Sequence, residues 1–179
     1  MEEIKKKQDK SFELLKKNFN YKNKMSAPKL VKVVLSSGTG SGLKRDKKIN
    51  EVVFDRLTKI TGQKPSLRKA KKSVASFKIR QGDPIGVMVN LRGERMYSFL
   101  DKLINIAFPR TKDFRGLKTS AVDEAGNLTI GIKEHIIFPE TSDEELKDVF
   151  GLAITLVSTA KNKKEATAFF ELIGIPFRK

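Results

Sequence analysis

The residues of this chain best suited to chemistry are the lysines and arginines of one short segment, and that chemistry is the binding of anions. From Gly62 to Arg80 the sequence has no Asp or Glu, and its basic residues are Lys64, Arg68, Lys69, Lys71, Lys72, Lys78 and Arg80. Such side chains neutralise phosphates and release counterions, whatever the sequence of the partner. The 179-residue chain carries a net charge of +16, which predicts a polyanionic partner.

A glycine-rich run from Ser36 to Gly42 is a second candidate, because glycine lets backbone N–H groups approach a phosphate. A Walker loop ends in Gly-Lys-Ser/Thr, whereas here Leu43 separates Gly42 from Lys44. The dinucleotide-binding pattern needs its third glycine one position later. A nucleotide-dependent enzyme therefore stays as an alternative. A backbone contact to nucleic-acid phosphate, or a plain strand-to-helix connection, fits the run better.

Groups that catalyse reactions or hold cofactors are scarce in this sequence. It has no cysteine and a single histidine, His135, which excludes disulfides, thiolate nucleophiles and cysteine-ligated zinc. Glu134 and His135 would point to opposite faces of a strand, so we expect a structural histidine. Asp123 and Glu124 open a segment of turn composition without the spaced carboxylates of a cation site. We therefore expect no enzyme, no cofactor and no metal site.

Hydrophobic periodicity predicts the elements that position these residues. An amphipathic helix is expected at about 2–20, and a second helix runs from Asp46, as its N-cap, to a stop at Gly62. Alternating apolar residues predict a β-hairpin from Val74 to Leu91, with a basic hairpin loop at about 70–84. The other expected elements are strands at 30–35, 128–132 and 152–157 and helices at 96–107 and 163–173.

This order of elements predicts a single α+β domain over residues 1–179, with a largely antiparallel sheet whose helices pack on one face and whose other face is open to RNA. RNA is favoured over DNA because no helix-turn-helix or zinc-finger pattern is present. The strands offer Ser36, Met88 and Asn90 to the open face rather than aromatic rings, so recognition by shape is expected rather than base stacking.

A membrane partner is the third possibility, and the sequence supports it only weakly. The first twenty residues form a modest cationic amphipathic helix. No stretch approaches the roughly 18 apolar residues that cross a bilayer, and the N-terminus lacks the apolar core of a secretory signal. We expect a cytosolic protein without a membrane partner.

Several blocks of the sequence, in order and at consistent spacing, resemble the L5 family of bacterial large-subunit ribosomal proteins. The blocks are Gly62–Pro65, Ala70–Gly82, Leu91–Met96, Pro109–Leu117, Glu134–Glu140 and Pro176–Lys179. The resemblance covers nearly the whole chain. It implies a non-catalytic, cofactor-free protein of the ribosome's central protuberance. Such a protein binds 5S ribosomal RNA through its open sheet face, near 23S ribosomal RNA and neighbouring large-subunit proteins.

The resemblance also implies roles for individual residues. Those carried over to ribosomal RNA binding are Ser36, Gln63, Lys64, Asn90 and Arg92. The family often has Asn in place of Ser36 and Thr in place of Asn90. Because all of these side chains are short and can hydrogen-bond, RNA contact is still expected at both positions, without a particular set of hydrogen bonds. Gln63 matches the family.

Two further contacts follow from the resemblance. The segment from Lys72 to Asp83 corresponds to the part that touches peptidyl-site transfer RNA. The candidate cations in this segment and directly before it are Lys71, Lys72, Lys78 and Arg80. The alternative is that these cations only neutralise nearby ribosomal RNA. The side turned toward a small-subunit protein includes the acidic stretch Glu140–Asp148 and the bridge candidates Arg110, Lys112 and Arg115.

Overall fold

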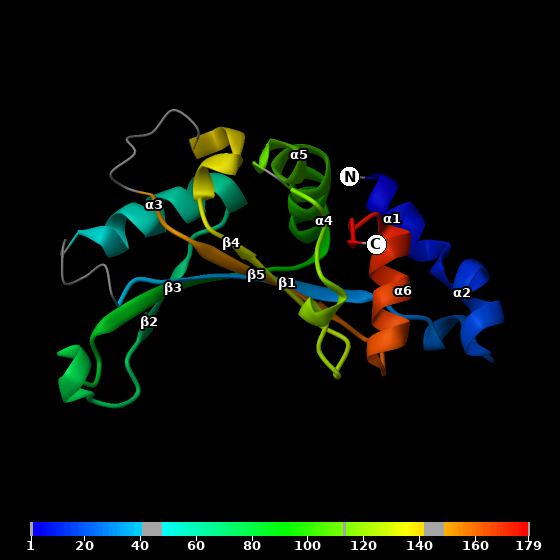
Figure 1. The fold of residues 1–179 in the computed structure, drawn as a ribbon, viewed down its shortest axis with the longest axis horizontal. Coiled ribbons are helices and arrows are strands. Elements are labelled where there is room, and N and C mark those ends of the chain that lie inside the picture. The colour runs from blue at the N-terminus through cyan, green and yellow to red at the C-terminus, as the bar shows by residue number, and fades with distance from the viewer. Residues whose placement is uncertain (1, 41–47, 113, 142–148, 179) are drawn as a thin grey trace. The chain divides into compact units, whose positions relative to one another are not determined.

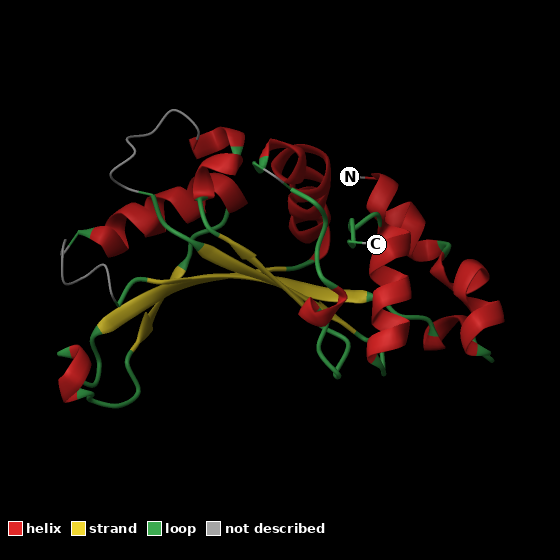
Figure 2. Ribbon diagram, in the orientation of Figure 1, coloured by secondary structure: helices red, strands yellow, loops and turns green. Residues whose placement is uncertain are grey.

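The strands of the chain form a five-stranded antiparallel sheet, drawn as arrows in Figures 1 and 2. The computed structural model describes residues 2–40, 48–112, 114–141 and 149–178. The strands lie in the order β2-β3-β1-β5-β4. Their bounds are β1 (Leu30–Gly38), β2 (Ser66–Lys69), β3 (Pro84–Leu91), β4 (Leu128–Ile132) and β5 (Leu152–Ser158). The predicted α+β class with an antiparallel sheet is confirmed.

The helices of the structure match most of the predicted ones. They are α1 (Glu2–Asp9), α2 (Ser11–Phe19), α3 (Ile49–Thr61), α4 (Gly93–Lys102), α5 (Phe108–Arg110) and α6 (Lys163–Ile173). Helix α4 continues through a π-helical stretch, η4 (Leu103–Ala107), into α5. The chain divides into two compact units. The first comprises 1–33, 91–130 and 155–179, and the second comprises 34–90 and 131–154.

The second unit packs α3 against strands of the sheet. Apolar residues spaced along one face of α3, Val53, Leu57 and Ile60, are almost fully buried, as amphipathic periodicity predicts. Gly62 ends the helix in the left-handed region (φ 64°) and its N–H donates to the carbonyl of Thr58, so the predicted stop is confirmed. The predicted N-cap Asp46 lies outside the described residues.

The first unit packs α1 against α4 and α6, and α2 against α6. Ile4 and Leu15 contribute buried apolar side chains from the N-terminal segment, and Phe169 and Phe170 do so from α6. The predicted single helix at about 2–20 is wrong in one respect, because the structure has two helices that meet at Lys10. Neither glycine nor proline marks this break in the sequence.

The predicted first strand of the hairpin is also wrong. Residues Ala75–Phe77 form a 3-10 turn, η3, rather than a strand, and only an isolated bridge joins Val74 to Ile79. The strand that pairs with β3 is β2, in antiparallel register with Ser66 opposite Met88. All four β2 residues are exposed, so this edge strand has no buried alternation for a sequence pattern to detect.

Candidate nucleic-acid interface

Alternation along the strands of the second unit gives the sheet two chemically different faces. Leu35, Val87 and Val89 are buried, so their neighbours in sequence point to the opposite face of the sheet. Pairing places Ser66 opposite Met88 and Arg68 opposite Gly86, on that same outer side. We define the open face as the residues that result: Ser36, Ser66, Arg68, Met88 and Asn90.

The open face is polar and cationic, and none of its members is acidic. Ser36 is half-buried, whereas Ser66, Arg68 and Asn90 are exposed. Arg68 lies beside Met88, with an Nη2 to Sδ distance of 3.6 Å. Gly86 has no side chain on this face. A larger residue would be crowded there, because its Cβ would lie 3.0 Å from the Ser37 carbonyl oxygen. Short donors and one guanidinium can hydrogen-bond the backbone of a folded RNA.

Gln63 connects the end of α3 to the open face. The left-handed Gly62 turns the chain out of the helix, and the Gln63 Nε2 then donates to the Asn90 carbonyl at 3.0 Å. The structure therefore brings together two residues that the sequence places 27 positions apart. Lys64 follows directly and is exposed. Arg92, the last of the predicted ribosomal-RNA residues, is exposed at the N-cap position of α4 and belongs to the first unit.

Buried hydrogen bonds hold the strands beneath this face. Ser37, the buried neighbour of Ser36, donates to the Gly151 carbonyl at 2.8 Å. The Asn50 amide donates to the Pro84 carbonyl at 2.9 Å and its oxygen accepts a bond from Thr39. These bonds join the ends of β1 and β3 to α3 and to Gly151, the residue before β5.

The loop from Ala70 to Asp83, here called the basic loop, closes the connection between β2 and β3. Its predicted cations are all exposed: Lys71, Lys72, Lys78 and Arg80. Its one acid, Asp83, accepts a hydrogen bond from the Arg80 N–H at 2.7 Å, so that carboxylate is engaged with the loop's own backbone. The basic loop therefore keeps a net positive charge, because its four cations outnumber its one acid.

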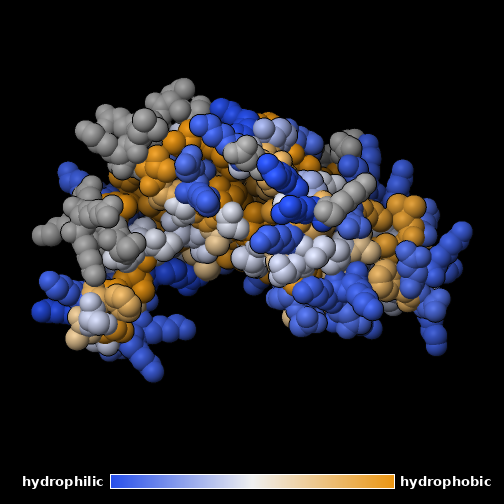
Figure 3. All heavy atoms as spheres, viewed as in Figure 1, coloured by the Kyte–Doolittle hydropathy of each residue, from blue (hydrophilic) through white to orange (hydrophobic). Residues whose placement is uncertain are grey.

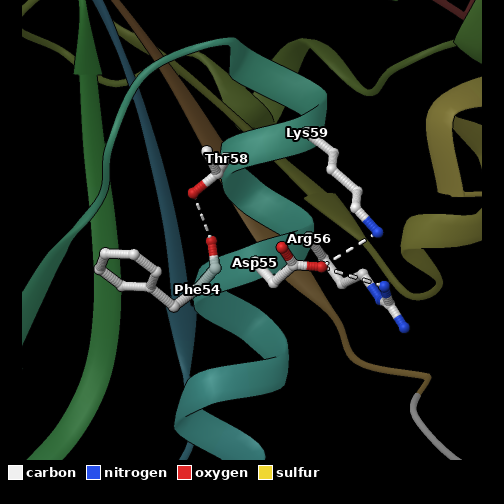
Figure 4. Close-up of polar contacts among 5 residues, drawn as sticks. All are labelled: Phe54, Asp55, Arg56, Thr58 and Lys59. Atoms are coloured by element: carbon white, nitrogen blue, oxygen red, sulfur yellow. Dashed lines mark hydrogen bonds and ion pairs between the residues drawn. The ribbon is translucent and has the colours of Figure 1, made fainter.

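The charged residues on α3 are arranged differently, as Figure 4 shows. The Asp55 carboxylate lies 3.2 Å from the Arg56 Nη1 and 3.1 Å from the Lys59 Nζ. Thr58 donates to the Phe54 carbonyl at 2.7 Å and takes no part in this cluster. The Asp55 carboxylate thereby offsets the charge of the two neighbouring cations. The basic loop is therefore the stronger anion-binding candidate.

The predicted bridge residues Arg110, Lys112 and Arg115 are exposed in the first unit, in and after α5. The C-terminal segment pairs with Leu117, which follows these residues in the chain. The Leu117 N–H donates to the Pro176 carbonyl and the Arg178 N–H donates to the Leu117 carbonyl, both at 2.8 Å. Residues 142–148 of the acidic stretch lie outside the described residues.

Sequence reasoning missed two residues of the open face, Ser66 and Arg68. Both lie on the short edge strand β2, which was not predicted because its four residues are exposed. The available signal was the lone apolar Leu67 between two polar residues, which is too short a pattern to identify a strand.

The other candidates have structural explanations. His135 is buried in a 3-10 turn, stacks on Phe150 at 4.2 Å, and accepts a hydrogen bond from that residue's N–H. This environment agrees with the predicted structural role, although the residue is not on a strand. Asp123 closes a turn through Asn127, whose backbone N–H is the main cause of a lowered pKa for that carboxyl. Part of the glycine run, 41–42, lies outside the described residues.

The residues that the structure describes contain neither a metal-ligand cluster nor a membrane-spanning helix. They contain no group of three or more histidine and acidic residues placed to hold a metal ion. Within the same ranges, no helix combines the length and the apolar character that crossing a bilayer requires.

A basic α+β chain with an uncovered polar sheet face has the features of the proteins that associate with nucleic acid. Comparison with known families gives the particular one. Residues 23–80 match the model described as ribosomal protein L5, and residues 84–177 match the model for the C-terminus of the same ribosomal family. The chain belongs to the ribosomal protein L5 family.

Curated relatives agree over nearly the full length. The chain is 51% identical over 165 residues to large ribosomal subunit protein uL5 of Desulfatibacillum aliphaticivorans, covering 92% of each chain. It is 50% identical over 159 residues to the uL5 protein of Carboxydothermus hydrogenoformans, covering 89% of this chain and 88% of that relative. The expected family is confirmed, and the chain is a ribosomal protein of the cytoplasm rather than an enzyme.

Proposed function

We propose that this chain binds 5S ribosomal RNA and helps to attach it to the central protuberance of the large subunit, with 23S ribosomal RNA and neighbouring proteins around it. In this proposal the whole chain, 1–179, serves as one ribosomal domain. The observation that carries the proposal is the open face, which combines exposed Ser66, Arg68 and Asn90 with the Gln63 bond to Asn90. Arg92 and Lys64 add exposed positive charge.

The basic loop serves in this proposal as the contact to peptidyl-site transfer RNA. The exposed cations Lys71, Lys72, Lys78 and Arg80 support it, since they can reach phosphates without losing an internal ion pair to Asp83. Neutralising adjacent ribosomal RNA is the second role open to the same side chains, because phosphate contacts carry no sequence information.

The third contact is an inter-subunit bridge. Arg110, Lys112 and Arg115 are exposed on a segment that the C-terminal residues hold in place. We assign this surface to a small-subunit ribosomal protein, on the strength of the family resemblance and the exposed charge.

The salt dependence of 5S RNA binding tests the main proposal. In a filter-binding titration, log affinity should fall linearly with log salt concentration, with a slope of about −0.7 to −0.9 for each phosphate neutralised. Alanine at both Arg68 and Lys64 should make the slope shallower by about one to two units, because two phosphate contacts are lost. Salt-independent binding, or an unchanged slope in this variant, contradicts the proposal. A nucleotide-dependent enzyme would instead bind and turn over a small nucleotide.

A further inference from the structure

Lys78, in the basic loop, has a backbone conformation that lysine rarely adopts. It ends the turn η3 with φ 55° and ψ 38°, which is the left-handed helical region. In that region a Cβ crowds the following carbonyl oxygen, so the residues that favour it are glycine and, less often, asparagine. A lysine therefore makes this position of the loop less stable than a glycine would.

The other positions with a positive φ show how unusual this residue choice is. Among the residues that the structure describes, six glycines and two other residues have a positive φ. Apart from Lys78, these positions hold the residue types that the conformation favours: Asn20, Gly62, Gly82, Gly93, Gly116, Gly126 and Gly174. Lys78 is the exception within the described ranges, so backbone preference does not explain its side chain.

Backbone hydrogen bonds on both sides hold Lys78 in this conformation. Its own N–H donates to the Ala75 carbonyl at 3.0 Å, and the Phe77 N–H donates to the Val74 carbonyl at 3.2 Å. Val74 and Ile79 exchange two bonds, of 2.9 and 3.2 Å. Backbone strain persists only where the surrounding structure fixes it, and it is concentrated at sites that bind ligands.

The surroundings of Lys78 are cationic. Its side chain is exposed, as are those of Lys71, Lys72 and Arg80 in the same loop, whereas the Asp83 carboxylate accepts a bond from the Arg80 N–H. In Figure 3, hydrophilic side chains project at the lower left of the molecule, at the place that η3 occupies in Figure 1. An anion is therefore the partner that this setting favours.

We propose that the left-handed backbone of Lys78 directs its ammonium group toward one phosphate of a folded RNA, and that the strain is retained for this contact. The inference rests on the proposed transfer-RNA contact of the basic loop and deepens it. The four cations of the loop are not equivalent: Lys78 makes a fixed contact, whereas the others add charge. A cation held in place before binding loses less entropy when the phosphate binds.

Hydrogen exchange tests the strain. In full-length Lys78→Gly protein, the Val74 amide should exchange about 3- to 10-fold more slowly than in wild type, because relief of the strain exceeds the entropy that glycine adds to the unfolded loop. Asn20→Gly is the matched control, since Asn20 has a φ of 50° and asparagine tolerates it. It should not slow exchange of the residue-20 amide, which donates to the Lys16 carbonyl. If Lys78→Gly does not slow exchange at Val74, Lys78 is not strained and the inference fails.

Affinity for a transfer RNA transcript tests the contact. At a salt concentration of about 0.1 M, Lys78→Ala and Lys78→Gly should each weaken binding about 5- to 10-fold and make the salt slope shallower by about one unit, because one phosphate contact is lost. Lys78→Arg keeps the charge and should bind within about twofold of wild type. A purely structural role of Lys78 would leave the salt slope unchanged.

Lys71→Ala is the matched control for charge, since Lys71 is an exposed cation of the same loop without a positive φ. It should weaken transcript binding less than Lys78→Ala does. Equal losses from these two variants, or wild-type binding by Lys78→Gly, overturn the inference.

A triple variant distinguishes this failure from that of the proposed function. Replacing Lys71, Lys72 and Arg80 with alanine should weaken transcript binding and make its salt slope shallower by about one to three units. If this variant binds weakly while every Lys78 variant binds normally, the loop contacts RNA through its other cations and only the inference about Lys78 is overturned. If none of the variants affects binding, both the proposed RNA contact of the loop and the inference are wrong.

Discussion

The side-chain amide of Gln63 links the end of α3 to strand β3. A substitution of Gln63 therefore tests the proposed RNA contact of the open face. Gln63→Glu removes the donor to the Asn90 carbonyl and places a carboxylate beside the open face. We expect the affinity for 5S RNA to fall about tenfold or more, equivalent to roughly 1.4 kcal/mol, because a negative charge repels phosphate and Asn90 loses its support.

Lys163→Glu is the control for this change. Lys163 lies on α6 in the first unit, with its Nζ 3.9 Å from the exposed Glu124 carboxylate. Its reversal alters the net charge by two units, whereas Gln63→Glu alters it by one. A larger loss from Gln63→Glu, measured by filter binding, therefore reports position rather than total charge. Equal losses would refute the assignment of the open face.

Tyr21 and Glu165 form a buried side-chain hydrogen bond in the first unit. The Tyr21 hydroxyl donates to the buried Glu165 Oε1 at 2.5 Å, while Oε2 accepts the Lys161 N–H at 2.7 Å. Burial, followed by the bond and charge of Glu165, raises the pKa of Tyr21. Since the raised pKa favours the neutral phenol in the folded state, its stabilisation is complete below the ordinary value near 10 and declines as pH rises above it.

Tyr21→Phe should lower the free energy of unfolding by about 1–3 kcal/mol near neutral pH, because a buried carboxylate loses a donor. Urea denaturation measures the difference, which should shrink above a pH of about 10. Tyr97→Phe is the comparison, since the Tyr97 hydroxyl accepts only a part-buried bond from Gln8 and its loss should cost less. A Tyr21→Phe protein as stable as wild type would show that this contact contributes nothing.

Elements with a buried face were predictable from the sequence, and those without one were not. Strand β4 and helix α6 have the predicted bounds, because Leu128 and Ile130 alternate into the core and Phe169 and Ile173 share one buried helical face. The exposed β2 was missed for lack of such a pattern.

The apolar residues from 75 to 79 explain the error at the hairpin. Their alternation resembles a strand, but Phe77 points to solvent and the backbone bonds are local. Similarly, the link between Gln63 and Asn90 depends on how α3 and β3 pack, which no local pattern encodes. The family resemblance supplied the individual site residues, whereas periodicity supplied only the open face. Ser36 and Asn90 lie on that face, and Gln63 borders it.

The segment that carries the proposed bridge residues Lys112 and Arg115, here called the bridge loop, meets the C-terminal residues at Gly116. This residue has a φ of 92°, and a Cβ on it would lie 2.8 Å from the Arg178 nitrogen and 2.9 Å from the Phe177 carbonyl carbon. Gly116→Ala should therefore open the pairing between Leu117 and the C-terminal residues. Faster hydrogen exchange of the Leu117 and Arg178 amides, which close that pairing, is the expected result.

Gly93→Ala is the matched control for backbone strain. Gly93 also has a positive φ, 58°, but a Cβ there meets nothing within 4 Å. It should cost only the left-handed penalty of about 1–2 kcal/mol, whereas Gly116→Ala should cost roughly 1–3 kcal/mol more from overpacking. If the two variants lose equal stability, and exchange at Leu117 is unchanged, the C-terminal segment does not position the bridge loop.

At the scale of the whole molecule, a net charge of +16 defines a binding surface only where the cations are clustered. In the second unit, the open face and the basic loop adjoin one another, because β2 and β3 contribute to the open face and the basic loop connects them. The first unit carries exposed Arg92 and the proposed bridge residues. In the proposed function, the chain organises RNA through fixed geometry and charge.

The absence of cysteine in the sequence allows the most direct test of the open face. A hydroxyl-radical source tethered to a single introduced cysteine cleaves only RNA that lies near it. Ser66→Cys places the source on the open face, and Lys164→Cys places it on the exposed side of α6 in the other unit. In complexes with 5S RNA, we expect localised strand cleavage from position 66 and little or none from position 164. Cleavage from position 164 with an intact backbone opposite position 66 would contradict the account.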